Sequence, residues 1–293
     1  MSFDRNGAAR HGAARGDSRA GSTAGLVWLP WKMAQTEDAG LLDRLTGAEL
    51  DVRPHGLEPA VLLNDGHVVA DALVMGEKRG FRLLWHGVCP LTPMDEGALA
   101  LFGGRSAELF AERFSEGDLR LPRRAWFSPE EGLKVLRWVP CGEQGFTFVG
   151  LPDRLEELFE GFMASGAEVQ SDEGWHRIKL EGWTFDPGWT EGRPCTPAEL
   201  GLAHRVAHSV PTKRGPLPLL GRVHAGQRLF VAGEEVGRVL AARGRYAVAL
   251  VDRTHAHTGV VFDCGAQAVT APFVVPGTPI VLNPGSDPAT GRV

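Results

Sequence analysis

One carboxylate stands inside an apolar stretch of the chain. Asp71 interrupts the run Val68–Val74, in which all of the remaining residues are apolar. A carboxylate with such neighbours must be paired with a cation, be solvated in a cleft, or have a raised pKa. Two interpretations stay open: Asp71 lies at a pocket, or it lies on the polar face of a half-buried strand, because alternate strand residues face opposite sides.

A second acid, Glu199, lies in the segment Thr196–Leu202. Thr196 is a good helix N-cap and Pro197 suits the first helical position, so the segment is predicted to begin a helix. Glu199 is then either a site carboxylate or a first-turn acid that complements the helix dipole, and its position favours the second interpretation.

The histidine pairs do not predict a metal site. His204 and His208 are spaced to lie on one side of a possible helix, but the metalloprotease motif needs Glu after its first His, and Arg205 stands there. His255 and His257 supply two ligands, whereas a catalytic zinc ion takes three from the protein. Both pairs are predicted to lie on solvated surfaces, with no metal bound.

The cysteines and the charge balance narrow the class of protein. The four cysteines (Cys89, Cys141, Cys195 and Cys264) lie far apart, which excludes a zinc ribbon or a disulfide scaffold and favours a reduced, cytoplasmic protein. Acids outnumber bases by 36 to 31, which argues against a nucleic-acid partner. No apolar run reaches the ~18 residues of a membrane helix, so no membrane partner is predicted.

The first half of the chain predicts a helix followed by a strand meander. A helix is expected over 37–45, capped by Thr36 and ended by Gly47. Strands are expected over 60–63 and 67–75, because the Asp-Gly between them is a strong hairpin signal. A third strand is expected over 81–85.

The middle of the chain alternates between predicted helices and strands. The apolar spacing over 96–114 favours two short helices, and a strand is expected over 125–127. Ser128 and Pro129 predict another helix start. A strand over 146–149 and an amphipathic helix over 152–164 follow, so the segment is α+β in type.

The last part of the folded chain predicts a small antiparallel barrel. Its expected strands are short, alternating and separated by glycine turns, which is typical of such barrels. They span 228–231, 235–240, 246–251, 260–262 and 269–271.

These patterns divide the chain into five parts. The segment 1–25 contains little to bury and is expected to be a disordered tail. Two α+β segments, 26–145 and 146–218, are expected to form one binding region. The barrel follows over 219–275, and the Pro- and Gly-rich end, 276–293, is expected to be flexible.

Three stretches, in this order, resemble one superfamily. Leu63–Val74 resembles a strand pair in which a glycine turn leads to acids and apolar residues. Arg177–Gly182 with Thr196–Leu202 is similar to the segment R-I-E-A-G … T-P-x-E-x-x-L. Gly226–Val231 and the residues up to Gly259 resemble a C-terminal barrel. The superfamily is that of the aminomethyltransferase (T-protein) of the glycine cleavage system and its YgfZ-type folate-binding relatives.

The chain departs from this superfamily in one motif. YgfZ-type proteins carry K-G-C-Y-x-G-Q-E before the barrel, where this chain has Lys213–Leu219. Lys213 and Gly215 remain, but the cysteine, the tyrosine and G-Q-E are missing. The motif is degenerate, so no thiol-dependent role can be transferred through it.

The resemblance implies a three-domain ring around a central pocket for tetrahydrofolate. It puts Glu199 where a carboxylate holds the pterin ring, and Asp71 where an acid lies near the reactive folate nitrogens and would serve as the catalytic residue. Basic side chains would hold the anionic glutamate tail, since arginine suits carboxylates. The basic residues expected around the ligand are Arg177, Lys213, Arg214 and Arg222, and the alternative for the three arginines is that they are solvated at the surface.

Three functions from different classes follow from this resemblance. The first is a tetrahydrofolate-binding accessory protein with a role in iron–sulfur protein maturation or maintenance, whose partners would be iron–sulfur proteins. The second is a tetrahydrofolate-dependent one-carbon transferase. The third is a catalytically inactive scaffold or interaction module.

Overall fold

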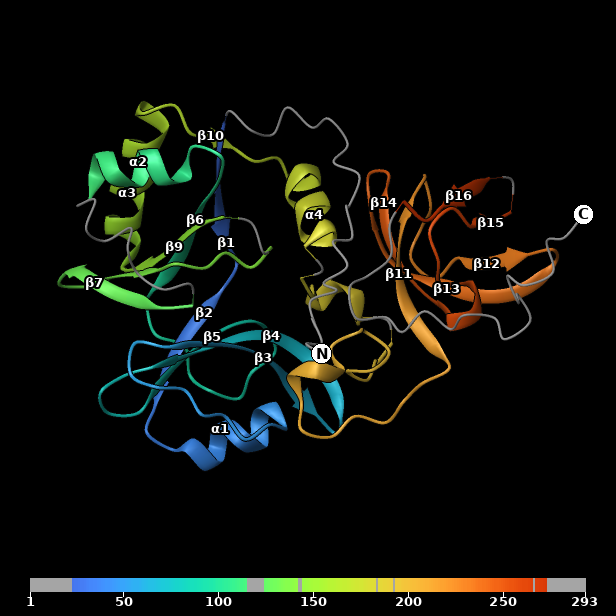
Figure 1. Ribbon diagram of the computed structural model, residues 1–293, viewed down its shortest axis with the longest axis horizontal. Helices are drawn as coiled ribbons and strands as arrows, with labels where there is room; N and C mark the ends of the chain where they lie inside the picture. The colour runs from blue at the N-terminus through green and yellow to red at the C-terminus, as the bar shows by residue number, and fades with distance from the viewer. Residues whose placement is uncertain are drawn as a thin grey trace, which may run out of the picture.

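A computed structural model describes residues 23–114, 124–141, 144–182, 184–191, 193–265 and 267–272. The described chain forms a mixed six-stranded sheet, an antiparallel four-stranded sheet, several helices and a closed C-terminal barrel, which confirms the predicted fold class (Figure 1). The expected flexible tail at 276–293 and most of the tail at 1–25 lie outside the described residues.

The first sheet has six strands and carries two helices on its outer face. Its spatial order is β10 (Glu168–Val169), β1 (Ala24–Leu29), β6 (Gly97–Gly103), β9 (Gly145–Gly150), β8 (Leu133–Leu136) and β7 (Trp126–Glu130). Helices α2 (Ser106–Arg113) and α3 (Pro152–Ala164) pack on it through a phenylalanine-rich cluster (Figure 1). The prediction of α3 is confirmed at both ends.

Two predicted helices in this region are strands. Over 96–114 only the second half is helical, because Gly97–Gly103 forms β6. Ala98 and Ala100 face one core while Leu99 and Leu101 face another, so both sides of β6 are apolar and its alternation is lost. The helix expected from Ser128 is also wrong: Ser128 and Pro129 lie in β7, an edge strand, where the missing N–H of proline is tolerated.

The second sheet has four strands and confirms the predicted meander. Its order is β2 (Lys32–Thr36), β5 (Phe81–Gly87), β4 (His67–Gly76) and β3 (Leu57–Asn64). Asp65 and Gly66 connect β3 to β4 with φ values of 49° and 77°, as a type I′ turn requires.

Helix α1 (Ala39–Thr46) covers the outer face of the four-stranded sheet (Figure 1). It starts later than predicted because Asp38, not Thr36, is its N-cap and accepts a hydrogen bond from the Leu41 N–H at 2.9 Å. Gly47 ends the helix as predicted, with a φ of 63°.

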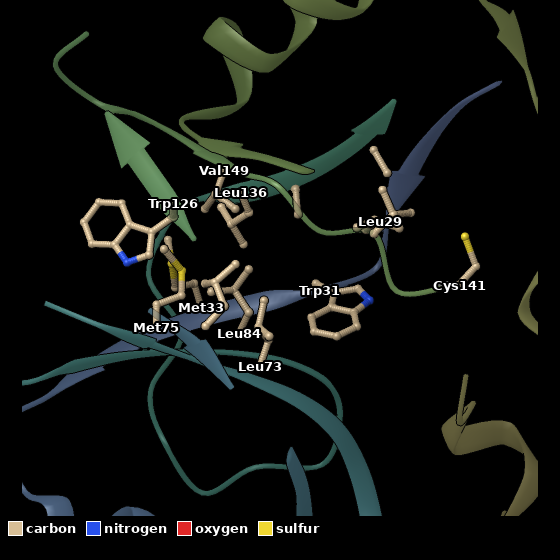
Figure 2. Close-up of a cluster of buried hydrophobic side chains, with 14 of the residues drawn as sticks. Leu29, Trp31, Met33, Leu73, Met75, Leu84, Trp126, Leu136, Cys141 and Val149 are labelled. Atoms are coloured by element: carbon tan, nitrogen blue, oxygen red, sulfur yellow. The ribbon is translucent and has the colours of Figure 1, made fainter. Parts of the chain in front are cut away.

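The inner faces of the two sheets pack on one another. Figure 2 shows Leu73, Met75 and Leu84 of the four-stranded sheet opposite Leu136 and Val149 of the six-stranded sheet. This cluster is the main hydrophobic core between the sheets, and it ends where β4 changes from apolar side chains to Asp71.

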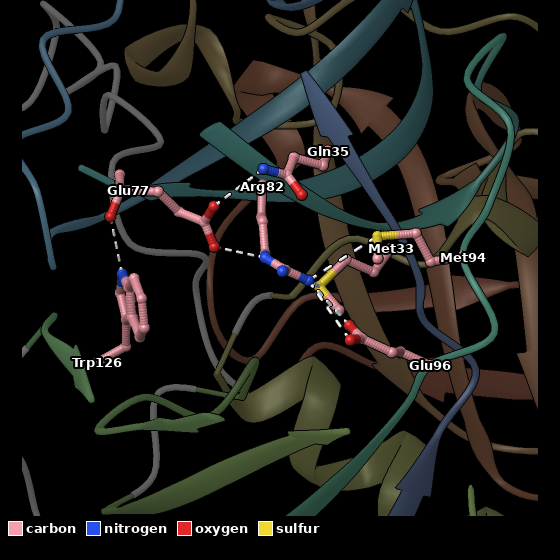
Figure 3. A network of polar contacts seen from close by, with 8 residues as sticks. Met33, Gln35, Glu77, Arg82, Met94, Glu96 and Trp126 are labelled. Atoms are coloured by element: carbon pink, nitrogen blue, oxygen red, sulfur yellow. Dashed lines mark hydrogen bonds and ion pairs between the residues drawn. The ribbon is translucent and has the colours of Figure 1, made fainter. Parts of the chain in front are cut away.

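A buried ion network closes one side of this interface. Arg82 on β5 pairs with Glu77 and, at 3.1 Å, with Glu96, and all three side chains are largely buried (Figure 3). The Arg82 guanidinium also lies beside the sulfur atoms of Met33 and Met94. The network therefore joins β5 to the segment that enters β6.

The barrel closes as predicted. Its order is β11 (Arg214–Leu220), β14 (Tyr246–Asp252), β13 (Glu234–Arg243), β12 (Arg228–Val231), β15 (Val261–Asp263) and β16 (Ala268–Thr270). The degenerate motif at Lys213–Leu219 lies almost entirely in β11, which begins ahead of the expected boundary at 219. Its residues therefore serve as the first barrel strand.

One connecting segment lies between the sheets and the barrel. It contains helix α4 (Asp172–Glu181) and the short 3₁₀ helices η2 (Pro187–Trp189) and η3 (Ala203–Arg205) (Figure 1). Helix α4 has no counterpart among the helices predicted from the sequence. The helix expected from Thr196 is also wrong, because residues 197–201 form turns.

The connecting segment is held by an apolar cluster that takes side chains from three directions. Its members are Val61 and Val68 of the four-stranded sheet, Leu180, Phe185, Trp189, Cys195, Leu200 and Leu202 of the segment, and Val248 of the barrel. Within the described ranges, no helix is long and apolar enough to cross a membrane.

We predict that the Arg82→Met substitution lowers the free energy of unfolding by about 3 kcal/mol, because it leaves Glu77 and Glu96 buried without a cation. The triple substitution Arg82→Met, Glu77→Gln and Glu96→Gln should regain most of this loss. Urea denaturation followed by circular dichroism measures both. Equal losses in the two variants would contradict the explanation by uncompensated charge.

Candidate functional site

Asp71 and His86 lie opposite one another on neighbouring strands. The register of β4 and β5 pairs these two residues directly, so their side chains share a face of the sheet. Asp71 lies on the same face of β4 as Leu73, which belongs to the core between the sheets. Asp71 therefore lies on the inner face, and the interpretation of a solvated outer face is wrong.

Arg205 on η3 supplies the cation that Asp71 requires. Its Nη1 lies 2.9 Å from Oδ1 of Asp71, and only 2 % of Asp71 is exposed. Burial raises the pKa of Asp71 to about 6, although the charge and hydrogen bond of Arg205 oppose the rise. The ion pair thus joins the four-stranded sheet to the far end of the connecting segment.

A second buried pair lies within the connecting segment. Lys179 on α4 binds Asp186, which also accepts a hydrogen bond from the Gly188 N–H at 3.0 Å and so caps η2. Burial alone would raise the pKa of Asp186, but the charge and hydrogen bond of Lys179 and the Gly188 N–H outweigh it, so the pKa is lowered.

Two histidines lie within electrostatic range of this pair. Burial lowers the pKa of His176 to about 4, and it also lowers the pKa of His86. Lys179 lowers both pKa values further, whereas Asp186 raises them. Both imidazoles are therefore neutral at physiological pH, where a neutral ring offers one donor and one acceptor.

A cavity of about 870 Å³ opens between η2 and barrel strand β13. Asp186, Trp189 and His176 line it from the connecting segment. Its basic lining residues are Arg193, Arg238 and Arg243. The cavity thus combines one buried carboxylate, one neutral imidazole, an aromatic ring and several guanidinium groups.

The site acid expected from the resemblance, Glu199, is engaged in local structure. Its carboxylate accepts a hydrogen bond from the Thr196 N–H at 3.0 Å and pairs with Arg193 at 3.0 Å. Glu199 does not line the cavity, whereas Arg193 does. Its contact with the cavity is therefore indirect, through the placement of Arg193.

The other basic residues expected around a ligand do not line this cavity either. Arg177 pairs with Glu181 on the surface of α4 at 3.1 Å, and Arg214 pairs with Asp252 at 3.4 Å. Lys213 and Arg222 are exposed at the two ends of β11. The structure thus brings Asp71 within electrostatic range of Lys179, but these four basic residues do not line the cavity.

The residues that do lie close together here were not among the predicted site residues: His86, His176, Lys179 and Asp186. Asp186 carries a local signal, since it precedes Pro187 and Gly188 as a turn or cap residue would. His86 could have been paired with Asp71 by extending the predicted meander. Nothing in the sequence indicated that Lys179 of α4 would pair with Asp186.

A second cavity, of about 670 Å³, has Arg205 in its lining. Glu49, Asp51 and Glu58 line it together with Arg124 and His204. Across the described ranges, no group of three or more potential ligands is placed to hold a metal ion.

Cys195 lies close to this region, but its thiol is not activated. The residue is fully buried, and burial raises the pKa of its thiol to about 11, with the charge of Glu199 adding to the rise. The nucleophile in thiol chemistry is the thiolate, so Cys195 is unsuited to such chemistry at neutral pH.

Comparisons with known proteins show a likeness in fold. No protein-family model matches the chain, and no curated protein matches its sequence. The crystal structure of the glycine cleavage system aminomethyltransferase T from Bartonella henselae is similar, with a TM-score of 0.69 and 16% sequence identity. The match covers 88% of this chain and 87% of that one. The chain therefore has the T-protein fold, as the resemblance implied.

We predict that Asp71 makes folding less favourable as the pH rises. Its folded-state pKa is raised from 3.8 to about 6, so the unfolded chain ionises first and stability falls between pH 4 and pH 6. The unfolding free energy of the wild type minus that of Asp71→Asn should therefore fall by about 3 kcal/mol as the pH rises through this window. Urea denaturation at each pH measures this difference.

The Asp186→Asn variant is the matched control for that measurement. The pKa of Asp186 is lowered, so its contribution to stability is present above the unfolded-state pKa and is lost as the pH falls. The difference between the wild type and Asp186→Asn should therefore rise with pH. Equal slopes for the two variants would contradict the assigned environments.

Proposed function

We propose that this chain is a tetrahydrofolate-binding protein with an accessory, non-catalytic role. The observation that carries the proposal is the cavity of about 870 Å³, in which Asp186 lies among several arginines in a chain of T-protein fold. The volume lies within the range of small-molecule sites.

The chemistry of the cavity suits both ends of a reduced folate. The pterin ring presents neighbouring N–H donors, which a buried carboxylate accepts as charge-assisted hydrogen bonds. The glutamate tail is anionic, and Arg238 and Arg243 at the cavity wall offer it guanidinium partners. Trp189 adds an aromatic surface beside Asp186.

The accessory role is favoured by the state of the acid that the resemblance assigns to catalysis. Asp71 is ion-paired with Arg205 and does not line the cavity, so its carboxylate is committed to a structural partner. Maintenance of iron–sulfur proteins is the accessory role that the resemblance suggests. The buried thiol of Cys195 argues for a route that needs no reactive cysteine.

One observation favours one-carbon transfer as a second candidate. The pKa of Asp71 is raised to about 6, which is suited to proton transfer near neutral pH. The named structural neighbour is itself an aminomethyltransferase. A transferase would require Asp71 to leave Arg205 and reach the bound folate.

We predict that the purified protein binds 5-formyltetrahydrofolate and that Ala225→Trp weakens this binding at least tenfold. Ala225 is an exposed residue on the rim of the larger cavity, so the indole would occupy ligand space without disturbing a core. Isothermal titration calorimetry measures the affinity. The matched control is Ala207→Trp, which crowds the smaller cavity and should leave the affinity unchanged.

The absence of binding up to about 1 mM ligand would reject both folate-dependent functions. If folate binds, an assay for 5,10-methylenetetrahydrofolate formation from aminomethyl donors separates the two. We expect no turnover by the wild type. Turnover that Asp71→Asn abolishes would establish the transferase instead, and low iron–sulfur enzyme activity in a deletion strain with normal glycine catabolism would support the accessory role.

A further inference from the structure

The smaller cavity is chemically distinct from the proposed folate site. Its volume of about 670 Å³ falls in the range of small-molecule sites. Its described lining comes from the segment after α1, from strand β3, from η3 and from Arg124, and it shares no residue with the lining of the larger cavity. The function proposed above therefore leaves the charged groups of this cavity without a role.

Arg205 links this cavity to the buried Asp71. Its Nη1 lies 2.9 Å from Oδ1 of Asp71, and only 17% of the Arg205 side chain is exposed. This hydrogen bond uses one of the five N–H donors of the guanidinium group. Arg205 can therefore hold Asp71 and still bind an anion in the cavity that it lines.

Arg124 brings a second guanidinium group to the cavity from just before β7. Its backbone is held in place, because the Leu57 N–H donates a hydrogen bond to its carbonyl oxygen at 3.0 Å. His204 adds no third cation at physiological pH, since burial and the charge of Arg205 lower its pKa. The cavity thus offers two guanidinium groups, whose planar donor arrangement suits a carboxylate.

Three carboxylates line the same cavity. Glu49 and Asp51 follow α1, and Glu58 lies on β3; we call them the three acids. All three residues are exposed, and no ion pair among the described residues includes them. Because Asp71 already balances Arg205, the three acids face only one further guanidinium group in the described lining. The cavity therefore favours a ligand with a net positive charge.

We propose that the smaller cavity binds a free α-amino acid with a cationic side chain, such as lysine. Arg205 and Arg124 bind the carboxylate of this ligand, and the three acids accept hydrogen bonds from its α-ammonium and side-chain ammonium groups. Both kinds of contact are charge-assisted hydrogen bonds, which are stronger than neutral ones. The ligand carries two ammonium groups and one carboxylate, so its net positive charge offsets part of the negative charge of the lining.

This arrangement distinguishes a basic amino acid from related compounds. A diamine has no carboxylate for the two guanidinium groups, and a neutral amino acid has no second cation for the three acids. The C-terminal lysine of a peptide has a carboxylate and a side-chain cation but no α-ammonium group. Because the three acids are exposed, we expect salt to weaken the binding.

Lysine and three analogues test the assignment, because each analogue lacks one of the charged groups. Cadaverine lacks the carboxylate, norleucine lacks the side-chain ammonium group, and Nα-acetyl-lysine lacks the α-ammonium group. We expect lysine to bind to the full chain in calorimetric titrations at low ionic strength, and each analogue to bind at least fivefold more weakly. The absence of lysine binding up to about 10 mM would overturn the inference.

Single substitutions connect each group of the ligand to its residues. Arg124→Met should weaken lysine binding at least fivefold and leave cadaverine binding unchanged, because cadaverine has no carboxylate. Glu58→Gln should weaken the binding of both. Asp71→Asn should strengthen lysine binding at least twofold, because Arg205 then no longer shares its charge with a buried carboxylate. Thermal unfolding of each variant checks that it is folded.

Three matched controls locate the site. Ala207→Trp crowds the smaller cavity and should abolish lysine binding, whereas Ala225→Trp in the larger cavity should leave it unchanged. Glu131→Gln removes an exposed acid that lines neither cavity, so it is the control for Glu58→Gln and should have no effect.

The results that contradict the inference are specific. Equal affinities for lysine and cadaverine would show that the guanidinium groups hold no carboxylate, and equal affinities for lysine and Nα-acetyl-lysine would reject a free amino acid. Lysine binding that Ala225→Trp abolishes would place the ligand in the other cavity. Lysine and 5-formyltetrahydrofolate are titrated separately, so failure of either one to bind leaves the other proposal intact.

Discussion

Burial of charge where the sheets and the barrel meet is the constraint on which the rest of the structure depends. Asp71 and Asp186 are both removed from water, and a buried carboxylate is tolerated only when a cation or several donors compensate it. Arg205 and Lys179 supply those cations, and both belong to the connecting segment. The Asp71–Arg205 pair therefore joins this segment to the four-stranded sheet, and the Lys179–Asp186 pair joins α4 to η2 within the segment.

The cavity follows from the same arrangement. Asp186 binds Lys179 and caps η2, and its carboxylate lines the cavity together with Trp189 and His176, while β13 supplies the facing residues. The side chains of Asp71 and Asp186 are almost fully buried, and those of Lys179 and Arg205 are largely buried, so little water reaches the pairs. The low dielectric that results keeps both histidines neutral and strengthens any hydrogen bond made inside the cavity.

Sequence patterns predicted those parts of the fold in which local rules decide the structure. The Asp65-Gly66 turn, the Gly47 stop, helix α3 and the barrel strands are each specified by a few neighbouring residues, and all are confirmed. Patterns failed where tertiary packing decides. Strand β6 is apolar on both faces because a core lies on each side, and its sequence is then indistinguishable from that of a buried helix.

The site, too, was predictable only where a local sequence pattern indicated it. Asp71 was recognisable because a carboxylate in an apolar strand breaks a pattern, but its partner Arg205 lies 134 residues away and only the folded chain joins them. His176 and Asp186 break no pattern: each follows an aromatic residue in a segment of mixed composition, and each gains its significance from the cavity. Glu199 matched a motif, yet the motif residue forms a local cap with Thr196.

The ion pair of Lys179 and Asp186 also accounts for how the chain departs from the motif that it resembles. In R-I-E-A-G an acid follows Arg and Ile, whereas here Lys179 follows Arg177 and Ile178. A buried lysine at that position requires an acid within reach, and Asp186 provides it from the turn after the helix.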